Sequence, residues 1–288
     1  MPLGSYSLAA LHRQYLPHQT PLLQITELRL LKYVVEIGVY DLYPKALFSL
    51  KLKYVLEHIV MLFMMRSIIK HTKGHTMNTI TLIGPDFSTF VKSIELVCNY
   101  KGISYQLSLE HEGKPLAIKD DSLLQLHPYK KVPILIDGDF ILPESNAIAR
   151  YLEHCGGATV FDVDPQKHAH IDAWASMLSI YAFRALITDY IIEIKNPSGP
   201  NAELNFEKLK SAQPAVLNTL QTINTQLAER NFLITEQFSL ADAIILPMLG
   251  YHMQLPGDLN LLAEFPNLVK YYQRISALPF CKGVLHTA

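Results

Sequence analysis

Two neighbouring pairs of residues could do chemistry, because each presents polar groups where a secondary-structure element begins. Glu144 and Ser145 follow an apolar run and stand at the start of a predicted helix over 145–154. Free N–H groups and the helix dipole at such a position favour an anion, and the Ser145 hydroxyl can add a hydrogen bond. Ser145 could instead serve only as the helix cap.

The second pair, Val132 and Pro133, opens a predicted hairpin that turns at Asp137 and Gly138. Proline is tolerated at the first residue of a strand because no ladder hydrogen bond is lost there. If the Val132–Pro133 bond is cis, the N–H and C=O of Val132 face outward, and an extended peptide could pair with them as an added strand. An ordinary trans proline at a strand edge is the alternative.

Cysteine usage and charge argue against other kinds of chemistry. Cys98, Cys155 and Cys281 are scattered, with no C-x-x-C pair and no Cys/His cluster. Neither a disulfide framework nor a metal site is predicted, which fits a reducing, cytoplasmic setting. The net charge is -1, so the chain has no basic excess of the kind that is typical of nucleic-acid binding. The apolar content of 49% favours a globular protein with a sizeable core.

The chain changes character near residue 76. Residues 1–76 hold 9 Lys and Arg against 4 Asp and Glu, whereas residues 77–288 hold 16 against 22. We predict that 1–76 is an extension of uncertain structure, or translated sequence upstream of a start at Met77. Its most apolar run, 59–65, is too short for a spanning helix of about 20 residues, so no stable membrane insertion is expected. Helices over 28–37 and, at a membrane surface, over 54–69 are alternatives.

Residues 77–157 alternate between strand and helix patterns. A β-branched run at 79–83 ends at Gly84-Pro85, a helical pattern covers 88–102, and 103–109 alternates as a second strand. A short irregular helix over 116–126, the hairpin and the helix over 145–154 complete the order β-α-β-α-β-β-α. This order predicts a thioredoxin-like unit.

The remainder of the chain has a helical pattern, which begins after a break at Asp164-Pro165. A first long helix should end at 196–200, and a second should cover 203–229. Ser239 and Asp242 form a capping box that should start a buried helix, with Phe238 as a hydrophobic staple facing Ala243. The first helix has one apolar face, formed by Ile171, Trp174, Leu178, Ala182 and Ala185.

Two stretches carry a family resemblance. Residues 84–88, which read GPDFS, and 126–152, which read LHPYKKVPILIDGDFILPESNAIARYL, resemble the cytosolic glutathione S-transferases, the serine-type phi and theta classes in particular. The resemblance extends to FSLAD at 238–242, covers 77–288 and leaves 1–76 without a counterpart. It implies an α/β plus all-α fold: a thioredoxin-like glutathione-binding domain over 77–157, a linker over 158–166 and a helical-bundle domain over 167–288 with the hydrophobic substrate site.

The resemblance implies that glutathione binds at the two pairs described above. Ser145 would hold the γ-glutamyl carboxylate, and Glu144 would pair with the ammonium beside it. Val132, presented by Pro133, would bond the cysteinyl backbone of glutathione through its main chain.

Two lysines align with positions that bind the glycyl carboxylate in the family. Lys131 stands where many relatives have glutamine, and a lysine can serve an anion as a point charge. Lys119 aligns across a variable segment. Both side chains could instead be simply solvated.

Ser88 is the residue that the resemblance implies for catalysis. A free thiol has a pKa of about 8.5, and a hydroxyl hydrogen bond to the sulfur at a helix start favours the nucleophilic thiolate. Ser88 would donate this bond rather than attack, and there is no sign of a Ser/His/Asp triad. Ser88 could instead be only an N-cap, with Asp86 and Thr89 as rival caps and Thr89 as a rival donor. No cysteine lies in 86–93, which argues against omega- or beta-type thiol chemistry.

The implied protein is a cytoplasmic, homodimeric glutathione transferase that uses glutathione as co-substrate, with no other cofactor and no metal. Its thiolate would attack hydrophobic electrophiles, and peroxide reduction is a possible second activity. A non-catalytic glutathione-transferase-like module for binding or assembly is the alternative. Phe87, Met177, Tyr181, Arg184 and Phe280 could line the second-substrate site or could be ordinary core residues.

Overall fold

The computed structural model describes residues 79–285. The chain divides into two compact units, Met1–Thr72 and Lys73–Ala288, and every described residue belongs to the second. The helices predicted over 28–37 and 54–69, and the boundary predicted before Met77, lie outside the described residues.

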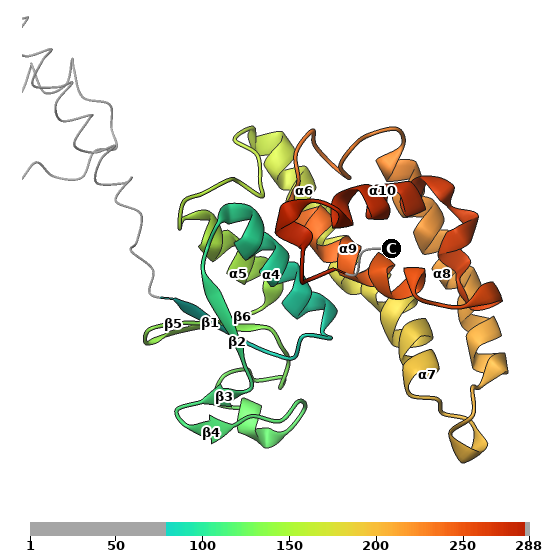
Figure 1. The fold of residues 1–288 in the computed structure, drawn as a ribbon, viewed down its shortest axis with the longest axis horizontal. Helices are drawn as coiled ribbons and strands as arrows, with labels where there is room; N and C mark the ends of the chain where they lie inside the picture. Colours follow the sequence, from blue (N-terminus) through green and yellow to red (C-terminus); the bar gives the residue numbers. More distant parts are fainter. Residues whose placement is uncertain (1–78, 286–288) are drawn as a thin grey trace, which may run out of the picture. The chain divides into compact units, whose positions relative to one another are not determined.

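A four-stranded sheet forms the first half of the second unit (Figure 1). It comprises β1 (Ile80–Ile83), β2 (Tyr105–Ser108), β5 (Ile134–Asp137) and β6 (Phe140–Pro143), in the order β2-β1-β5-β6. β1 and β2 are parallel, so they need a crossover, and α4 (Thr89–Lys101) supplies it. β5 pairs antiparallel with both β1 and β6. This topology confirms the predicted thioredoxin-like unit.

The sheet has an apolar layer on each face. On one face, α4 and α5 (Ser145–Glu153) cover the strands, and Ile80, Leu82 and Leu135 pack with Ile94 and Ile148 in the main core. On the other face, Ile83 and Ile134 pack with Leu116, Leu123 and Leu126 from the segment between β2 and β5.

That segment differs from the predicted helix over 116–126. It contains a small hairpin, β3 (Glu110–His111) with β4 (Lys114–Pro115), and one 3-10 turn, η1 (Asp121–Leu123). Lys119 adopts a left-handed backbone conformation with φ of 66°, which interrupts an α-helix at that point. The prediction of a helix there is therefore wrong, although Leu116, Leu123 and Leu126 still bury themselves against the sheet.

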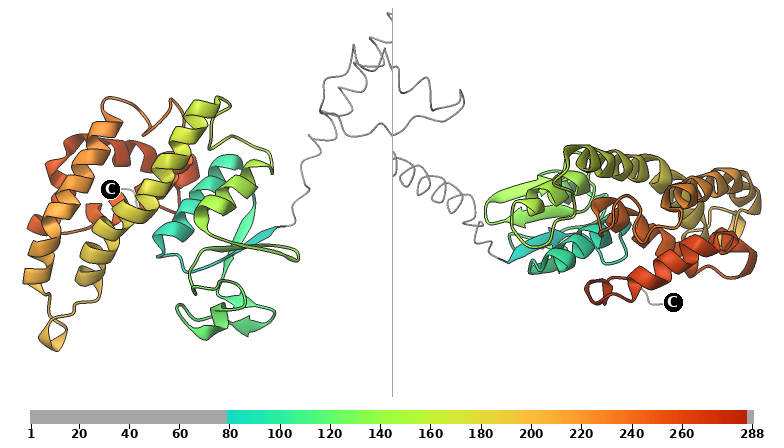
Figure 2. Two further views of the ribbon diagram at one scale, coloured as in Figure 1. Left: turned by 180° about the vertical axis from the view of Figure 1, so that it is seen from behind. Right: turned by 90° about the horizontal axis from the view of Figure 1, so that it is seen from above.

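The second half of the unit is helical, as predicted (Figure 2). One continuous helix runs from Pro165 to Lys195 and consists of α6 (Pro165–Met177), a π-helical stretch η2 (Leu178–Ile191) and α7 (Ile192–Lys195). The other α-helices are α8 (Phe206–Leu227), α9 (Leu240–Met253) and α10 (Pro266–Ser276). Short 3-10 turns complete this half: η3 (Pro200–Ala202), η4 (Gly257–Leu259), η5 (Leu261–Glu264) and η6 (Pro279–Cys281).

The long helix begins at a cap and has a buried face. Asp164 accepts hydrogen bonds from the N–H groups of Gln166 and Lys167, at 2.8 and 3.1 Å. By length and composition it is the one helix among the described residues that could cross a membrane, a test that core helices of soluble proteins also pass. Ile171 and Leu178 lie in the main core, which identifies it as a core helix.

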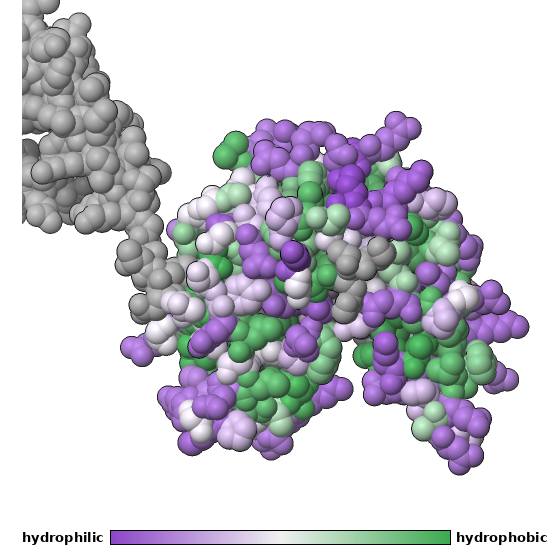
Figure 3. Space-filling model, viewed as in Figure 1, coloured by the Kyte–Doolittle hydropathy of each residue, from purple (hydrophilic) through white to green (hydrophobic). Residues whose placement is uncertain are grey.

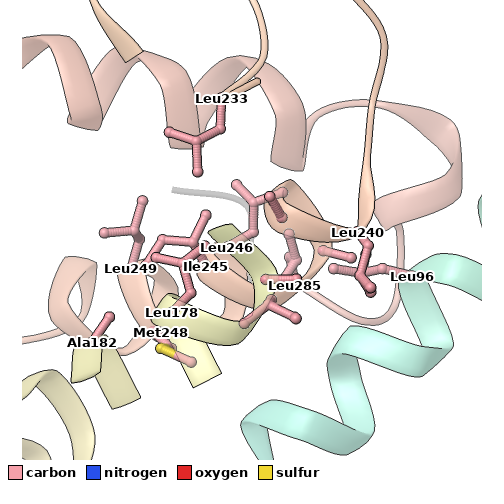
Figure 4. Packing of buried hydrophobic residues seen from close by; sticks show 14 of the residues in the cluster. Leu96, Leu178, Ala182, Leu233, Leu240, Ile245, Leu246, Met248, Leu249 and Leu285 are labelled. Carbon is pink, nitrogen blue, oxygen red and sulfur yellow. The ribbon is translucent and has the colours of Figure 1, made fainter. Parts of the chain in front are cut away.

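The central helix α9 is buried along nearly its whole length and is the packing centre of the unit. In Figure 4, Ile245, Leu246 and Leu249 lie among apolar side chains from the surrounding elements, and Leu96 of α4 approaches Leu240. A single core therefore runs from the sheet domain into the helical domain.

Asp242 anchors the start of α9. Its carboxylate accepts hydrogen bonds from the N–H and the hydroxyl of Ser239, at 2.9 and 2.6 Å. The bond from the Ser239 N–H is one half of the predicted capping box, and the Ser239 side chain completes the box by accepting from the N–H of Asp242. The Asp242 carboxylate also accepts from the N–H of Leu233 and from the hydroxyl of Tyr271. Burial raises the pKa of Asp242, and these four hydrogen bonds oppose that effect. Phe238, predicted as a staple, is buried against the ring of Tyr100 at 5.0 Å.

We expect Asp242→Ala to destabilise the protein strongly, because three buried donor residues would lose their acceptor. An unsatisfied buried donor costs about 1–3 kcal/mol, so the free energy of unfolding should fall by roughly 3 kcal/mol or more in urea denaturation. Asp164→Ala, which removes an exposed cap, is the matched control and should lose about 1 kcal/mol. Equal losses in the two variants would contradict a special role for the buried carboxylate.

A second carboxylate, Glu193, joins the end of the long helix to the start of α8. It accepts hydrogen bonds from Lys208 Nζ at 2.7 Å, from the N–H and hydroxyl of Ser198, and from the N–H of Asn205. Lys208, followed by Ser198, lowers the pKa of Glu193 to about 2 from an ordinary value of 4.5. The ionised form is thus favoured in the folded protein.

This depressed pKa predicts an acid-dependent contribution to stability. Because the folded state holds the proton less tightly, the contribution of Glu193 is complete above pH 4.5 and is lost as the pH falls towards about 2. The difference in urea midpoint between the native protein and Glu193→Gln should therefore shrink across this window. The control Glu207→Gln alters an exposed carboxylate at the start of α8. A difference between native and Glu193→Gln that stays constant from pH 5 to pH 2.5 would refute the assignment.

Candidate functional site

Strand register brings the predicted site residues to one end of the sheet. Ile83, the last residue of β1, lies opposite Ile134, the first residue of β5. Ile134 in turn lies opposite Pro143, the last residue of β6. Three connections therefore meet at this end: the loop 84–88, the residues just before β5, and the residues just after β6.

Gly84 lets the loop 84–88 and the residues before β5 come close together. A Cβ at Gly84 would lie 2.4 Å from Cγ2 of Val91 and 3.2 Å from Cβ of Val132, and the φ of 150° disfavours any other residue. The N–H of Gly84 donates to the carbonyl of Ser108 at 3.1 Å. The absence of a side chain thus lets Val132 and the first turn of α4 pack on the end of β1.

Ser88 is the N-cap of α4, and its hydroxyl oxygen accepts a hydrogen bond from the N–H of Val91 at 3.4 Å. Of the rival caps, Thr89 is already the first helical residue, and it is buried. The N-cap interpretation of Ser88 does not compete with the catalytic one. A hydroxyl has one donor and two acceptor positions, so capping leaves the Ser88 proton free to bond a sulfur at the helix start.

The Val132–Pro133 bond is cis, which answers the alternative left open by the sequence. Among the described residues, no hydrogen bond engages the N–H or C=O of Val132. The side chain of Val132 instead packs against the smaller core beneath the sheet. The main chain of Val132 is therefore available to a ligand, as the sequence interpretation requires.

Ser145 is not the cap of α5, which was the alternative interpretation of this residue. Glu144 occupies the cap position with a φ of 74° and makes no side-chain cap hydrogen bond, whereas Ser145 is already the first helical residue and is buried. The N–H groups of the first turn lack intrahelical partners and face the same end of the sheet. Asn146 adds a buried side-chain oxygen that has no hydrogen-bond partner among the described residues.

The two lysines predicted for the glycyl carboxylate are exposed. Lys131 directly precedes Val132, so it lies at the site, whereas Lys119 lies between β4 and η1. In the described part of the chain neither ammonium forms an ion pair, and the solvated alternative stays open for both. Their neighbour Lys130 is engaged elsewhere, because its Nζ lies 2.8 Å from Asp121 Oδ1.

Two residues at the site were missed in the sequence. His127 is buried, and its Nε2 lies 3.4 Å from Oε1 of Glu144. Tyr251, near the end of α9, donates its hydroxyl proton to the carbonyl of Phe87. His127 could have been noticed as a polar residue in the run before the hairpin, but nothing in the sequence relates Tyr251 to a loop 164 residues away.

The helical domain approaches the site through η2. Phe183 of η2 packs against Phe90 in the first turn of α4, with ring centroids 4.7 Å apart. Phe87 is 64% exposed and Tyr181 is 68% exposed, so both rings are open to solvent. Met177 and Arg184 are also exposed. Figure 3 shows a hollow at the lower edge of the molecule, between the sheet domain and the helical domain, with apolar residues on both sides.

Phe280 does not belong to this group. Its ring packs against Tyr100 at 5.1 Å and Phe238 at 4.8 Å, and its carbonyl accepts from the side chain of Asn99. Asn99 is near the C-terminal end of α4, about 16 Å from Ser88 at the 1.5 Å helical rise per residue. The core alternative is therefore the correct one for Phe280.

The fold is a thioredoxin-like domain joined to a helical domain, and the candidate site lies at one end of the sheet. Residues 82–157 match the glutathione S-transferase N-terminal domain, and residues 183–279 match the glutathione S-transferase C-terminal domain. The chain belongs to the glutathione S-transferase family.

Individual relatives agree with this assignment. Glutathione S-transferase F12 of Arabidopsis thaliana is 30% identical over 173 residues, which are 58% of this chain and 78% of that protein. The probable elongation factor 1-gamma 2 of the same plant is 25% identical over 194 residues, which are 67% of this chain but only 46% of that protein. The crystal structure of poplar glutathione transferase F1 aligns with a TM-score of 0.62 at 23% identity, covering 72% of this chain and 96% of that one, and so shows the shared fold.

We expect Tyr251→Phe to loosen the loop that carries Ser88, because the hydroxyl hydrogen bond to Phe87 joins that loop to the helical domain. A net loss of about 1 kcal/mol would raise amide hydrogen exchange in 84–88 roughly fivefold. Tyr181→Phe, which removes an exposed hydroxyl, is the control and should leave exchange unchanged. Unchanged protection of 84–88 in Tyr251→Phe would show that the loop is held by its own packing.

Proposed function

We propose that this chain is a glutathione transferase that activates the thiol of glutathione at Ser88 and directs the thiolate at apolar electrophiles. The observation that carries the proposal is the convergence of Ser88, Val132, Glu144 and Ser145 at one end of the sheet. Family membership supports it, since the relatives named above include glutathione S-transferases.

Each part of glutathione has a counterpart at this end of the sheet. The γ-glutamyl carboxylate binds at the start of α5 with the Ser145 hydroxyl, and the ammonium pairs with Glu144. The cysteinyl backbone pairs with the free main chain of Val132, which the cis Pro133 presents. Lys131 and Lys119 provide point charges for the glycyl carboxylate.

In this proposal the cysteinyl sulfur of glutathione lies at the start of α4. There the Ser88 proton and the positive end of the helix favour the thiolate over the thiol. The thiolate then attacks an apolar electrophile held by the exposed rings of Phe87 and Tyr181, and peroxide reduction is a second reaction open to the same nucleophile. No metal takes part in this chemistry, and glutathione is a co-substrate rather than a resident cofactor.

We further propose the setting of the enzyme. The thioredoxin-like domain spans 77–157, a linker spans 158–166, the helical domain spans 167–288, and 1–76 is an extension. The protein is a cytoplasmic homodimer that neither binds nucleic acid nor inserts stably into membranes. These statements rest on the family, on the near-neutral charge and on the sequence patterns described above.

Replacing Ser88 with alanine should raise the pKa of the bound glutathione thiol by about 1–2 units, because a hydrogen bond to a charged group is worth roughly 1.5–3 kcal/mol. Conjugation of a model aryl halide near neutral pH should slow at least tenfold. The thiol pKa can be followed by the ultraviolet absorbance of the bound thiolate against pH.

Thr89→Val is the matched variant, since it removes the neighbouring hydroxyl and keeps the side-chain shape. It should leave the thiol pKa within a few tenths of a unit of the native value. If Thr89→Val shifts the pKa and Ser88→Ala does not, Thr89 is the donor and the assignment of Ser88 fails.

A non-catalytic module for binding or assembly is the second candidate. The match to elongation factor 1-gamma proteins favours it, because those relatives are not named as transferases. A binding test combined with activity assays separates the transferase from the module. Binding to immobilised glutathione, without conjugation of aryl halides or enals and without reduction of hydroperoxides, would favour the module.

A further inference from the structure

His127 stands between two partners at the glutathione end of the sheet. Its ring is 3% exposed, its Nδ1 lies 3.0 Å from the main-chain nitrogen of Tyr129, and its Nε2 lies 3.4 Å from Oε1 of Glu144. No part of the mechanism above uses this side chain. Both of its ring nitrogens are nevertheless directed at named groups.

The Tyr129 contact fixes the tautomer of the ring. A main-chain N–H can only donate, so Nδ1 of His127 must accept and carry no proton. The single proton of the neutral ring is then on Nε2, on the side of Glu144. The histidine thus offers its one donor to the carboxylate, and the hydrogen bond at the other nitrogen holds the ring in that orientation.

Glu144 needs such support. Its side chain is 70% exposed, and no other described residue forms a hydrogen bond or ion pair with its carboxylate. Its backbone has a φ of 74°, which is unusual for a residue other than glycine and is typical of positions where surrounding structure enforces a functional geometry. An exposed glutamate without a partner would lose rotamer freedom when it binds an ammonium, and this loss weakens binding.

We propose that His127 is a positioning residue for glutathione: through its Nε2 proton it holds the Glu144 carboxylate where the γ-glutamyl ammonium binds. This inference rests on the proposed function, because it assumes that glutathione occupies the sheet end. His127 itself touches no part of glutathione, and its effect passes entirely through Glu144.

Two substitutions separate the two contacts of the ring. The amide oxygen of His127→Asn can replace Nδ1 as the acceptor for Tyr129, but nothing in that variant reaches Glu144. The longer side chain of His127→Gln places an amide donor near the former Nε2 position and loses the Tyr129 contact. The first variant therefore tests the Glu144 contact, and the second is its rescue.

The ligand provides the other half of the test. Deamino-glutathione lacks the γ-glutamyl amino group, so it has no ammonium for Glu144 to hold. We expect His127→Asn to weaken glutathione binding about tenfold in calorimetry, by analogy with the loss of one hydrogen bond to a charged group. The same variant should bind deamino-glutathione within twofold of the native protein, and His127→Gln should recover most of the lost affinity for glutathione.

A general structural role predicts a different pattern, in which His127→Asn weakens both ligands by the same factor. That result, or unchanged binding of glutathione, overturns the proposal. If the native protein binds neither ligand, the proposed function fails as well, so the two failures are distinguishable.

A measurement on the unsubstituted protein covers the case in which a variant does not fold. Nitrogen-15 spectra of the histidine rings should show His127 as the neutral tautomer with its proton on Nε2. Its ring signals should shift when glutathione binds, and shift much less when deamino-glutathione binds. A proton on Nδ1, or equal shifts with the two ligands, would likewise overturn the proposal.

Discussion

The antiparallel pairing of β5 with both β1 and β6 is the constraint on which the rest of the structure depends. It places the end of β1, the start of β5 and the end of β6 side by side. Ser88, Val132 and Ser145 therefore lie at one end of the sheet, although 57 positions of sequence separate Ser88 from Ser145. A slip of one residue would exchange the faces on which Ile134 and Leu135 lie and would move the start of β5 away from the end of β1. Leu135 packs in the main core and Ile134 in the smaller cluster on the other face, so the packing of the two faces matches the register that forms the site.

The helix α4 connects this end of the sheet to the helical domain. Ser88 is its N-cap, and its apolar side chains pack against α9 and the C-terminal segment in a single core. Polar contacts follow the same route, because Lys92 Nζ donates to the carbonyl of Val284 at 2.6 Å and Tyr251 donates to Phe87. Contacts from the helical domain therefore reach both the first turns of α4 and the loop that carries Ser88.

Polar residues that the sequence predicts as helix caps also make, or remain able to make, hydrogen bonds outside the cap. Ser88 caps α4 while its proton stays free, and Asp242 caps α9 while it also holds Leu233 and Tyr271. Glu144 occupies a cap position without capping, and its carboxylate lies against His127 instead. Helix starts are suited to such double use, since their N–H groups need partners and their dipole favours negative charge.

The sequence by itself determined the order of strands and helices, the hairpin with its proline, and the capping box at Ser239 and Asp242, because these depend on local periodicity, turn residues and short spacings. It also pointed to the family through the motifs at 84–88 and 126–152. It failed over 116–126, where the left-handed Lys119 divides an apolar pattern that otherwise looks helical. Only the tertiary structure decided that His127 lies against Glu144, that Tyr251 bonds to Phe87 in the Ser88 loop and that Phe280 is core. Each of these contacts joins segments whose approach is set by strand pairing and core packing rather than by neighbouring residues.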